Sequence, residues 1–437
     1  MSALDSSTDV VIIGGGIIGC SIAYNLALRG VAVTLVDKGP IGYEQSTRNW
    51  GWVHQQVRYP HLIPLAVESV RMWKHLAEDL ESDVGWIQGG NLSLGFDDAD
   101  LAEFELRGEI ARNTGLETTV LSRAQVVEML PGMARMKGSW TGALHLPTDG
   151  QADPSLVTAA FARGAKRHGA HIVSDCAVSG IDMAGGSVTG VLTERGPIRA
   201  PQVVVAAGAW SSRLTRPLGV EFPQRSVRAT VMRTDPVDPV TSVTAWAKGF
   251  TFRQDRAGRF VLAGGEEAIY DVDLDLFRDI RWFLPMAWKN RRWIRMSVGR
   301  PLLRDLTARM PGMAARRQFW QRRRKIDPPA DSKAVRETLE RFHRLFPDLA
   351  GVGIELAWAG NIDSTPDQAP IIGPVGRGPT GLFIATGFSG HGFALGPAAG
   401  RLGADLVLGD NPLVNPHPFR YARFAEGDVP VVDAHRR

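Results

Sequence analysis

The chain has 437 residues, 44% of them hydrophobic, which is enough for a large core that we expect to divide into two intertwined domains. This composition argues against disorder except at the ends. The chain has only two cysteines, Cys20 and Cys176, which excludes a disulfide framework or a zinc cluster. Its ten histidines show no pairing at metal-ligand spacing, so no metal site is predicted.

Residues 9–38 have the pattern of a complete dinucleotide-binding unit. An apolar strand, a Gly-x-Gly-x-x-Gly turn, a helix and a second strand follow one another in the order that this unit requires. These parts are Val10–Ile13, the turn glycines Gly14, Gly16 and Gly19, the helix Ile17–Arg29 and the strand Val31–Val36. A chance occurrence of the glycine pattern would not be accompanied by both strands and the helix in this order.

The glycines and the acidic residue of this unit each have a structural role. Gly14 permits the tight turn, Gly16 lets a pyrophosphate approach the helix N-terminus, and Gly19 lets helix and strand pack closely. Asp37 lies about 20 residues past the glycines, where a carboxylate can accept hydrogen bonds from an adenosine ribose. An acid at this position disfavours a 2′-phosphate.

The apolar run Val10–Leu28 contains no charged residue and could be mistaken for a signal peptide or a membrane span. Three consecutive glycines, the polar Ser21 and Asn25, and the lack of a basic leader before the run argue against both. We therefore expect a cytoplasmic protein.

The middle of the chain alternates predicted helices and strands before a second glycine turn. The expected elements are a β-rich stretch at Asn49–Val57, a helix His61–Leu80, two short strands within Asp83–Phe96, helices Ala99–Thr114 and Ser122–Leu130, a helix that Asp153 caps and that ends at His168, and strands His171–Ile181, Ser187–Glu194 and Val203–Ala206. The last strand runs into the turn that contains Gly208.

The C-terminal half begins with strands that suggest a separate antiparallel sheet and ends with a third strand and glycine turn. The expected elements are strands Ser226–Thr234, Ala245–Arg253 and Arg259–Leu262, a helix Ser332–Phe346, a strand Gly353–Ala359, a loop Asp363–Pro374, a strand Leu382–Thr386 and a closing helix Pro397–Leu408.

If the turns at Gly14, Gly208 and Gly387 converge on one cofactor, the nucleotide-binding domain must be discontinuous. We assign residues 1–87, 145–222 and 350–437 to it. Residues 88–144 and 223–349 are assigned to a substrate or cap domain inserted into it.

The segment 277–325 is basic and aromatic, with fifteen Lys or Arg residues, two acids and four tryptophans. It is expected to be mostly helical, broken at Pro285, Pro301 and Pro311. Three interpretations remain open: an internally paired or solvated cap, a surface for an acidic membrane or a protein partner, and an entrance for anionic substrates. No nucleic-acid-binding pattern accompanies the charge.

Four blocks resemble the D-amino-acid oxidase superfamily of FAD-dependent amine oxidoreductases, which includes sarcosine and glycine oxidases, dimethylglycine-type dehydrogenases and D-amino-acid dehydrogenases. They are VVIIGGGIIGCSIAYNLALRG with Asp37, STRNWGW, VVVAAGAWS, and STPDQAPIIGP followed by GLFIATGFSGHGFALGPAAG. The resemblance implies an α/β fold: a discontinuous Rossmann-like FAD-binding domain with an inserted antiparallel-sheet substrate domain of the α+β type.

The resemblance also implies a non-covalent FAD site, because neither cysteine lies near the last block. In this interpretation the glycines hold the pyrophosphate, Asp37 holds the ribose, and the last glycine turn lines the pyrimidine end of the flavin. The implied cofactor-binding residues are Gly14, Gly16, Ile17, Gly19, Asp37, Lys38, Ser46, Thr47, Arg48, Val178, Ala207, Gly208, Trp210, Gly387, Gly390, His391, Gly392 and Phe393.

The chain departs from sarcosine oxidases at two positions. Ala394 replaces a lysine that pairs with the substrate carboxylate, so carboxylate recognition must differ. The strand Arg259–Ala263 lacks the lysine thought to assist reaction with oxygen, so oxygen is not the expected acceptor.

The candidates for catalytic roles are His391, His54 and Arg58. Arg58 is the best candidate for an anion anchor, with a surface ion pair as the alternative, whereas the setting of His391 suggests flavin contact more than proton abstraction. For Trp50 and Trp52, core packing is favoured over a substrate wall.

The predicted function is FAD-dependent oxidation of the C–N bond of an amino acid or secondary amine, giving an imine that hydrolyses. The alternatives are a flavoprotein subunit of a larger amine or opine-type dehydrogenase that docks a partner or the inner face of a membrane, and a non-catalytic flavoprotein.

Overall fold

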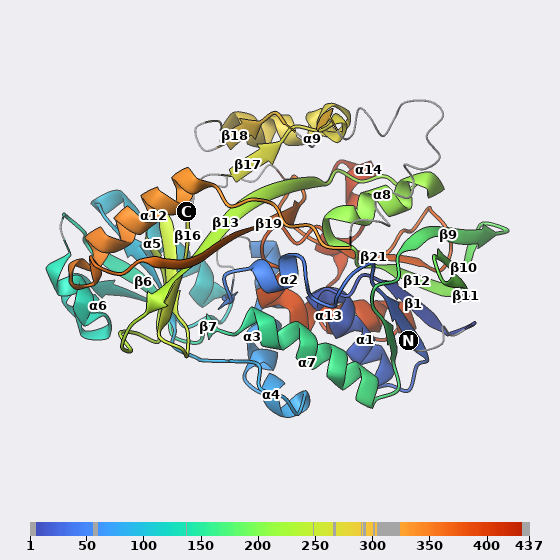
Figure 1. Cartoon of the computed structure of the whole chain (residues 1–437), viewed down its shortest axis with the longest axis horizontal. Coiled ribbons are helices and arrows are strands. Elements are labelled where there is room, and N and C mark those ends of the chain that lie inside the picture. Colours follow the sequence, from blue (N-terminus) through green and yellow to red (C-terminus); the bar gives the residue numbers. More distant parts are fainter. Residues whose placement is uncertain are drawn as a thin grey trace.

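The computed structural model describes residues 6–55, 60–136, 138–247, 249–264, 268–289, 291, 294–299, 302–303 and 324–430. Two sheets organise this part of the chain, one next to the nucleotide-binding helix and one in the other half of the molecule (Figure 1).

The first sheet has six strands, and its centre is the strand predicted at the start of the chain. Its order is β20 (Ile371–Pro374), β21 (Leu382–Thr386), β12 (Gln202–Val205), β1 (Val10–Ile13), β2 (Val33–Val36) and β8 (His171–Val173). All neighbours pair in parallel except β20 and β21. The three strands that precede the three glycine turns are therefore adjacent, so their carboxyl ends lie together.

Alternation of side chains along β1 explains why this strand is apolar throughout. Val10 and Ile12 face a core formed with the helices α1 (Ile17–Ala27), α7 (Pro154–Arg167) and α13 (Gly392–Leu408). Val11 and Ile13 face a second core on the opposite side of the sheet. A strand that is buried on both faces needs a continuous apolar run. The second core includes residues of a three-stranded sheet made of β9 (Val178–Ala184), β10 (Ser187–Thr193) and β11 (Gly196–Arg199).

The second large sheet has ten strands and is mostly antiparallel. Its strands are β18 (Ile294–Ser297), β17 (Ala268–Asp271), β13 (Arg225–Pro236), β16 (Arg259–Gly264), β15 (Phe250–Gln254), β14 (Thr244–Ala247), β4 (Asn91–Gly95), β6 (Gly142–Leu146) and β5 (Thr119–Ser122), with β19 (Ile354–Ser364) paired to β13. Two pairs, β4 with β14 and β17 with β18, are parallel, and the other pairs of this sheet are antiparallel, as the sequence predicts. The long strands β13 and β19 run from this sheet toward the first one (Figure 1).

The remaining elements complete the two halves. They are α2 (Gln45–Arg48), the short pair β3 (Trp52–Val53) and β7 (Gly150–Gln151), α3 (Ile63–Trp73), α4 (Leu76–Asp79), α5 (Asp98–Asn113), α6 (Arg123–Met129), α8 (Ser211–Thr215), α9 (Leu274–Lys289), α12 (Ser332–Leu345) and α14 (Arg423–Glu426). In the described ranges, no helix has both the length and the apolar character that a membrane crossing needs.

Several predicted elements are wrong in extent. The expected helix His61–Leu80 is divided into α3 and α4, the expected strand His171–Ile181 into β8 and β9, and the expected strand Ala245–Arg253 into β14 and β15. In the described part of the expected stretch Asn49–Val57, which ends at Gln55, the strand is the two-residue β3. The expected loop Asp363–Pro374 includes β20. In each case apolar periodicity indicated the element but not the break or pairing that tertiary contacts impose.

Two prolines do not mark helix boundaries as predicted: Pro285 was expected to break a helix, and Pro397 to begin the closing helix. The predicted breaks at Pro301 and Pro311 lie outside the described residues. Pro285 lies inside α9, and α13 begins at Gly392, so Pro397 is internal to it. A proline removes one intrahelical hydrogen bond, and burial of α13 between α1 and α3 offsets that loss.

The predicted domain boundaries remain a proposal. The ten-stranded sheet includes β6 and β19, so chain that we assigned to the FAD-binding domain also contributes strands to the substrate side.

Candidate functional site

A cavity of about 690 Å³ lies where the three glycine turns meet. This volume is within the range of small-molecule and cofactor sites. Its wall includes thirteen of the predicted cofactor residues: Gly14, Gly16, Ile17, Asp37, Lys38, Ser46, Val178, Ala207, Gly208, Trp210, Gly390, Gly392 and Phe393. These residues come from every predicted block, so the structure brings together segments that are far apart in the sequence.

The first turn has the close contacts that its glycines were expected to permit. Gly14 has a φ of +115°, and a Cβ there would lie 2.3 Å from the Ala206 carbonyl oxygen. A Cβ at Gly19 would lie 2.0 Å from the Gly14 oxygen. Both glycines are therefore required by backbone packing. Gly19 itself does not line the cavity.

The N-terminus of α1 faces the cavity and suits an anion. Gly16 caps the helix without a side-chain hydrogen bond, and the first turn contains no acidic residue. The Ile17 N–H donates to Ser46 Oγ at 2.9 Å, and a Cβ at Gly16 would lie 3.0 Å from the same oxygen. Helix N–H groups and the helix dipole favour a phosphate here. This arrangement fits a cofactor pyrophosphate.

Asp37 lies at the end of β2 on the cavity wall. Its carboxylate accepts hydrogen bonds from the N–H groups of Gly15 at 2.6 Å and Gly39 at 2.7 Å. Burial raises the pKa of Asp37 to about 6, and the two N–H donors offset the effect only in part. The carboxylate is thus held in one orientation beside the cavity, as a ribose acceptor requires.

Lys38 and Trp210 form one side of the wall together with Glu44. The Lys38 ammonium pairs with Glu44 at 2.6 Å and lies 4.7 Å from the centre of the Trp210 ring. The Trp210 Nε1–H donates to Glu44 Oε2 at 2.8 Å. The predicted turn after β12 is therefore tied to the loop after β2.

Asp363, which was not among the predicted site residues, fixes the third glycine turn by hydrogen bonds. Asp363 lies at the end of β19, accepts from the Gly387 N–H at 2.5 Å and from Thr386 Oγ1 at 2.7 Å, and lines the cavity. Gln224 donates to its other oxygen at 2.5 Å, and burial raises the pKa of Asp363. The sequence signal that could have identified Asp363 as a site residue is its position just before the Thr-Pro-Asp loop.

Four other predicted cofactor residues lie behind the cavity wall. Gly387 has a φ of +78° and shapes the turn. Thr47 donates to the Tyr43 carbonyl at 3.3 Å, and Arg48 donates to the Ala359 carbonyl at 2.9 Å and pairs with Asp327 at 2.6 Å. His391 precedes α13 as its N-cap. We therefore expect these four residues to support the cavity wall and not to contact FAD directly.

The two candidate catalytic histidines contact each other next to Gly390 and Gly392, and neither of them lines the cavity. The ring centres of His54 and His391 are 6.0 Å apart, and His54 also contacts Trp52 at 6.0 Å. Trp52 in turn contacts Trp50 and Trp246. Trp52 is 8% exposed and belongs to the core, whereas both histidines are half-buried. Arg58 lies outside the described residues.

The end of the basic segment is not a free surface. Arg324 lines the cavity, donates to the Lys38 carbonyl at 3.0 Å and pairs with Glu194 at 2.5 Å. Its own carbonyl would be 2.1 Å from a Cβ at Gly39. Arg324 is therefore part of the cavity wall beside Asp37 and not only a surface charge.

Both cysteines are buried and free, and burial raises the pKa of the Cys20 thiol. Among the residues that the structure describes, no three His, Cys, Asp or Glu side chains gather as metal ligands would.

The chain is similar to flavoenzymes over nearly its whole length. It is 26% identical over 425 residues to glycine oxidase of Geobacillus kaustophilus, covering 95% of this chain and 97% of that protein. It is 26% identical to sarcosine oxidase subunit beta of an Arthrobacter species, covering 98% and 93%. The structure of L-amino acid deaminase from Proteus myxofaciens in complex with anthranilate superposes with a TM-score of 0.90 at 29% identity, covering 97% of this chain and 95% of that one. A model of the family described as FAD dependent oxidoreductase, DAO, matches residues 9–406, and the chain therefore belongs to this family.

Proposed function

We propose that the protein oxidises the C–N bond of an α-amino acid or a secondary amine with FAD as cofactor. The observation that carries this proposal is the meeting of three strand-end glycine turns around one cavity of cofactor size. When bound there, FAD accepts a hydride equivalent from the substrate carbon. The resulting imine hydrolyses in water. The resemblance to glycine oxidase, a sarcosine oxidase subunit and an L-amino acid deaminase supports this substrate class.

The residues of the site bind and orient and need not supply a strong base. In our proposal the α1 N-terminus and Ser46 hold the pyrophosphate, Asp37 holds the ribose, and the backbone of Val178 meets the adenine. The N-terminus of α13 stabilises negative charge at the pyrimidine end. His54 and His391 border the substrate space and restrict water, and Arg58 remains the proposed anion anchor.

Carboxylate recognition must differ from that of sarcosine oxidases for a reason visible in the fold. Ala394, which replaces their lysine, is buried in the first turn of α13, and its carbonyl accepts from Ser69 Oγ at 2.6 Å and from Trp73 Nε1 at 2.9 Å. No long side chain projects from this position.

The decisive experiment is anaerobic reduction of the purified protein by a panel of substrates. We expect yellow protein whose flavin is released by acid precipitation and whose absorbance near the flavin maximum bleaches with one class among L-, D- and N-methyl amino acids and opines. Reoxidation should be slower in air than with a quinone or dye. Gly16→Val serves as the control, since the added Cβ and methyls would occupy the pyrophosphate space and leave a colourless protein. Bound flavin that no member of the panel reduces would favour the non-catalytic alternative.

A second proposal concerns docking, and it is carried by the exposed face of α9. Phe277, Ile280, Leu284 and Trp288 are 63%, 47%, 55% and 69% exposed and share one side of this helix by their spacing. Lys289, Arg281 and Arg291 lie beside them, with Arg291 over the Trp288 ring at 5.4 Å. An apolar stripe flanked by cations suits an anionic membrane surface. Peripheral association with a membrane that holds a quinone acceptor would agree with the proposed slow reaction with oxygen.

A further inference from the structure

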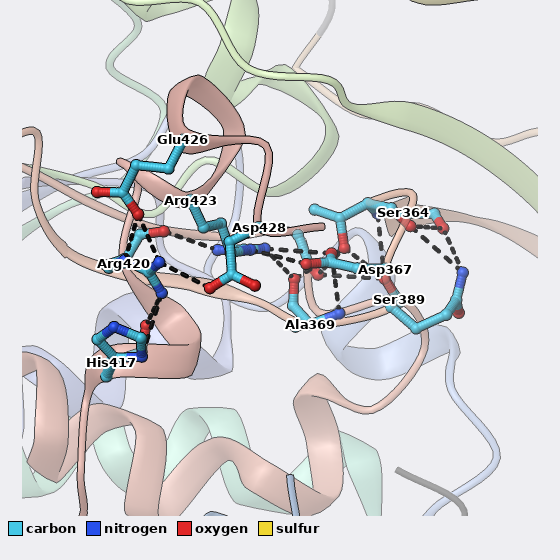
Figure 2. A network of polar contacts seen from close by, with 12 residues as sticks. Ser364, Asp367, Ala369, Ser389, His417, Arg420, Arg423, Glu426 and Asp428 are labelled. Atoms are coloured by element: carbon cyan, nitrogen blue, oxygen red, sulfur yellow. Dashed lines mark hydrogen bonds and ion pairs between the residues drawn. The ribbon is translucent and has the colours of Figure 1, made fainter. Parts of the chain in front are cut away.

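Arg423 and Asp367 form an ion pair that is almost completely buried, with 1% of each residue exposed (Figure 2). Arg423 Nε donates to Asp367 Oδ2 at 2.7 Å, and Nη2 donates to Oδ1 at 3.2 Å. Nη2 also donates to the Ala369 carbonyl at 2.8 Å, and Nη1 donates to the Arg420 carbonyl at 3.1 Å. Arg423 therefore ties α14, near the C-terminal end, to the loop between β19 and β20.

This loop is connected by hydrogen bonds to the third glycine turn. Thr365 Oγ1 donates to the same Ala369 carbonyl at 2.8 Å, and the Thr365 N–H donates to Ser389 Oγ at 3.1 Å. Ser389 Oγ in turn donates to the Gly387 carbonyl at 3.2 Å. Figure 2 shows the resulting chain of contacts, which runs from Arg423 through Asp367 and Ala369 toward Ser389.

The turn and the loop need this support because their backbones are strained. Ser389 has a φ of +52° and Gln368 has a φ of +59°, which non-glycine residues adopt only when their surroundings enforce it. A Cβ at Gly387 would lie 2.5 Å from Thr365 Cγ2, so the loop and the turn cannot shift independently. Phe388 and Gly390, on either side of Ser389, line the cavity.

We propose that Arg423 is a positioning residue of the FAD site. By neutralising Asp367 and fixing the Thr365 loop, it sets the conformation of the turn Gly387–Gly390 against the flavin. Arg423 thus connects α14 to the cofactor site, although Arg423 itself does not line the cavity. This inference rests on the placement of the pyrimidine end of the flavin at that turn in the proposed function.

The test compares two arginines that are three residues apart. Arg423→Met removes the buried charge. Arg420→Met removes the pairs to Glu426 at 2.5 Å and Asp428 at 2.7 Å and the hydrogen bond to the His417 carbonyl at 2.7 Å, none of which reaches the Asp367 loop. The measurements are the Kd of FAD by fluorescence titration of the apoprotein and the visible spectrum of bound flavin. We expect the first variant to raise the Kd at least tenfold and to shift the spectrum, and the second to stay within twofold of the wild type. Arg423→Lys should recover part of the affinity.

The outcomes separate this inference from the proposed function. An Arg423→Met variant that melts at a lower temperature but keeps the wild-type Kd and spectrum would show a merely structural role and overturn the inference. If that variant does not fold, Ser389→Ala tests the next link, and an unchanged Kd there would have the same meaning. A wild-type protein that binds no FAD would instead refute the proposed function.

Discussion

The carboxylate of Asp37 gives FAD binding an expected dependence on pH. The pKa of Asp37 is raised to about 6, and its charged form, whose two oxygens only accept, is the stronger partner for the two hydroxyls of a ribose. Binding that favours the carboxylate must therefore weaken as the pH falls through about 6, because a proton has to be released first. We expect the Kd of FAD to rise by about tenfold per pH unit below that value.

Asp37→Asn should remove most of this pH dependence and weaken FAD binding at pH 8, where the wild-type side chain is charged. Fluorescence titrations of the apoprotein at several pH values measure both effects. Glu105→Gln, on the exposed side of α5, is the control and should leave the pH profile unchanged. A wild-type Kd that is constant from pH 8 to pH 5 would exclude Asp37 as the titrating group.

At the scale of residues, local motifs were predictable and long-range partners were not. The turn glycines and Asp37 follow from short spacings whose physical reasons are local. Asp363 is brought to the cavity by the pairing of its strand β19, and Arg324 is held there by its ion pair with Glu194. The partners in both contacts are far apart in the sequence, so a local pattern could not predict them. The charge of the segment around Arg324 suggested a surface, and the cavity contact was hidden by that pattern.

At the scale of elements, the packing of α13 against α1 leads to a prediction about stability. A Cβ at Gly400 would lie 2.0 Å from Ser21 Oγ and 2.8 Å from the Ser21 backbone carbon. Because this overlap involves backbone atoms of Ser21, α1 and α13 would have to move apart in the variant. We expect Gly400→Ala to lower the free energy of unfolding by about 1–3 kcal/mol, even though alanine favours the helix itself.

Chemical denaturation with and without FAD measures this effect. Gly108→Ala is the matched control, since Gly108 also lies inside a helix but its Cβ would meet only side-chain atoms, the flexible Arg112 guanidinium at 3.2 Å and Thr118 Oγ1 at 3.5 Å. This control should be neutral or slightly stabilising. Equal stabilities of the two variants would contradict the close packing of α1 and α13.

The extents of elements were predicted well where a capping residue marks them. Ser122 and Gln125 form the capping box of α6, and Asp153 caps α7, as expected. Prolines were less reliable markers, because the burial of α13 outweighs the lost hydrogen bond at Pro397. Helix boundaries therefore depend on tertiary packing as well as on local signals.

At the scale of the whole molecule, the fold class, the family and FAD as cofactor were predicted from the sequence and are confirmed. The family and the cofactor were implied by the resemblance of four sequence blocks. The three glycine turns predicted that distant segments meet at one cofactor site, because parallel strands align their carboxyl ends. The partners within the ten-stranded sheet were not predictable. The parallel pairing of β4 with β14 joins residues about 150 positions apart, as in Thr244 with Asn91, and no local pattern specifies that register.

The described part of the basic segment has features that two of the interpretations left open by its composition would require. Arg278, Arg295 and Arg324 pair with acids, as an internal cap requires. The helix α9 lies with β17 and β18 at the edge of the molecule (Figure 1), and its exposed stripe is what a docking surface would require. A charge reversal at Arg322–Arg324 would confuse the two roles, because Arg324 borders the cavity and the other two lie outside the described residues.

The stripe itself gives the cleaner test of docking. Leu284→Ser with Trp288→Ser removes two exposed apolar side chains, each worth about 1–2 kcal/mol when buried in an interface, so binding to phosphatidylglycerol vesicles should fall at least tenfold. Arg281→Glu with Arg291→Glu should weaken binding mainly at low salt.

Cosedimentation measures binding, and flavin absorbance checks that the cofactor site is intact. Leu106→Ser, which changes an equally exposed leucine on α5, is the control and should bind as the wild type does. Wild-type protein that stays in the supernatant, or variants that sediment as it does, would leave α9 without a role at a membrane and direct the search to a protein partner.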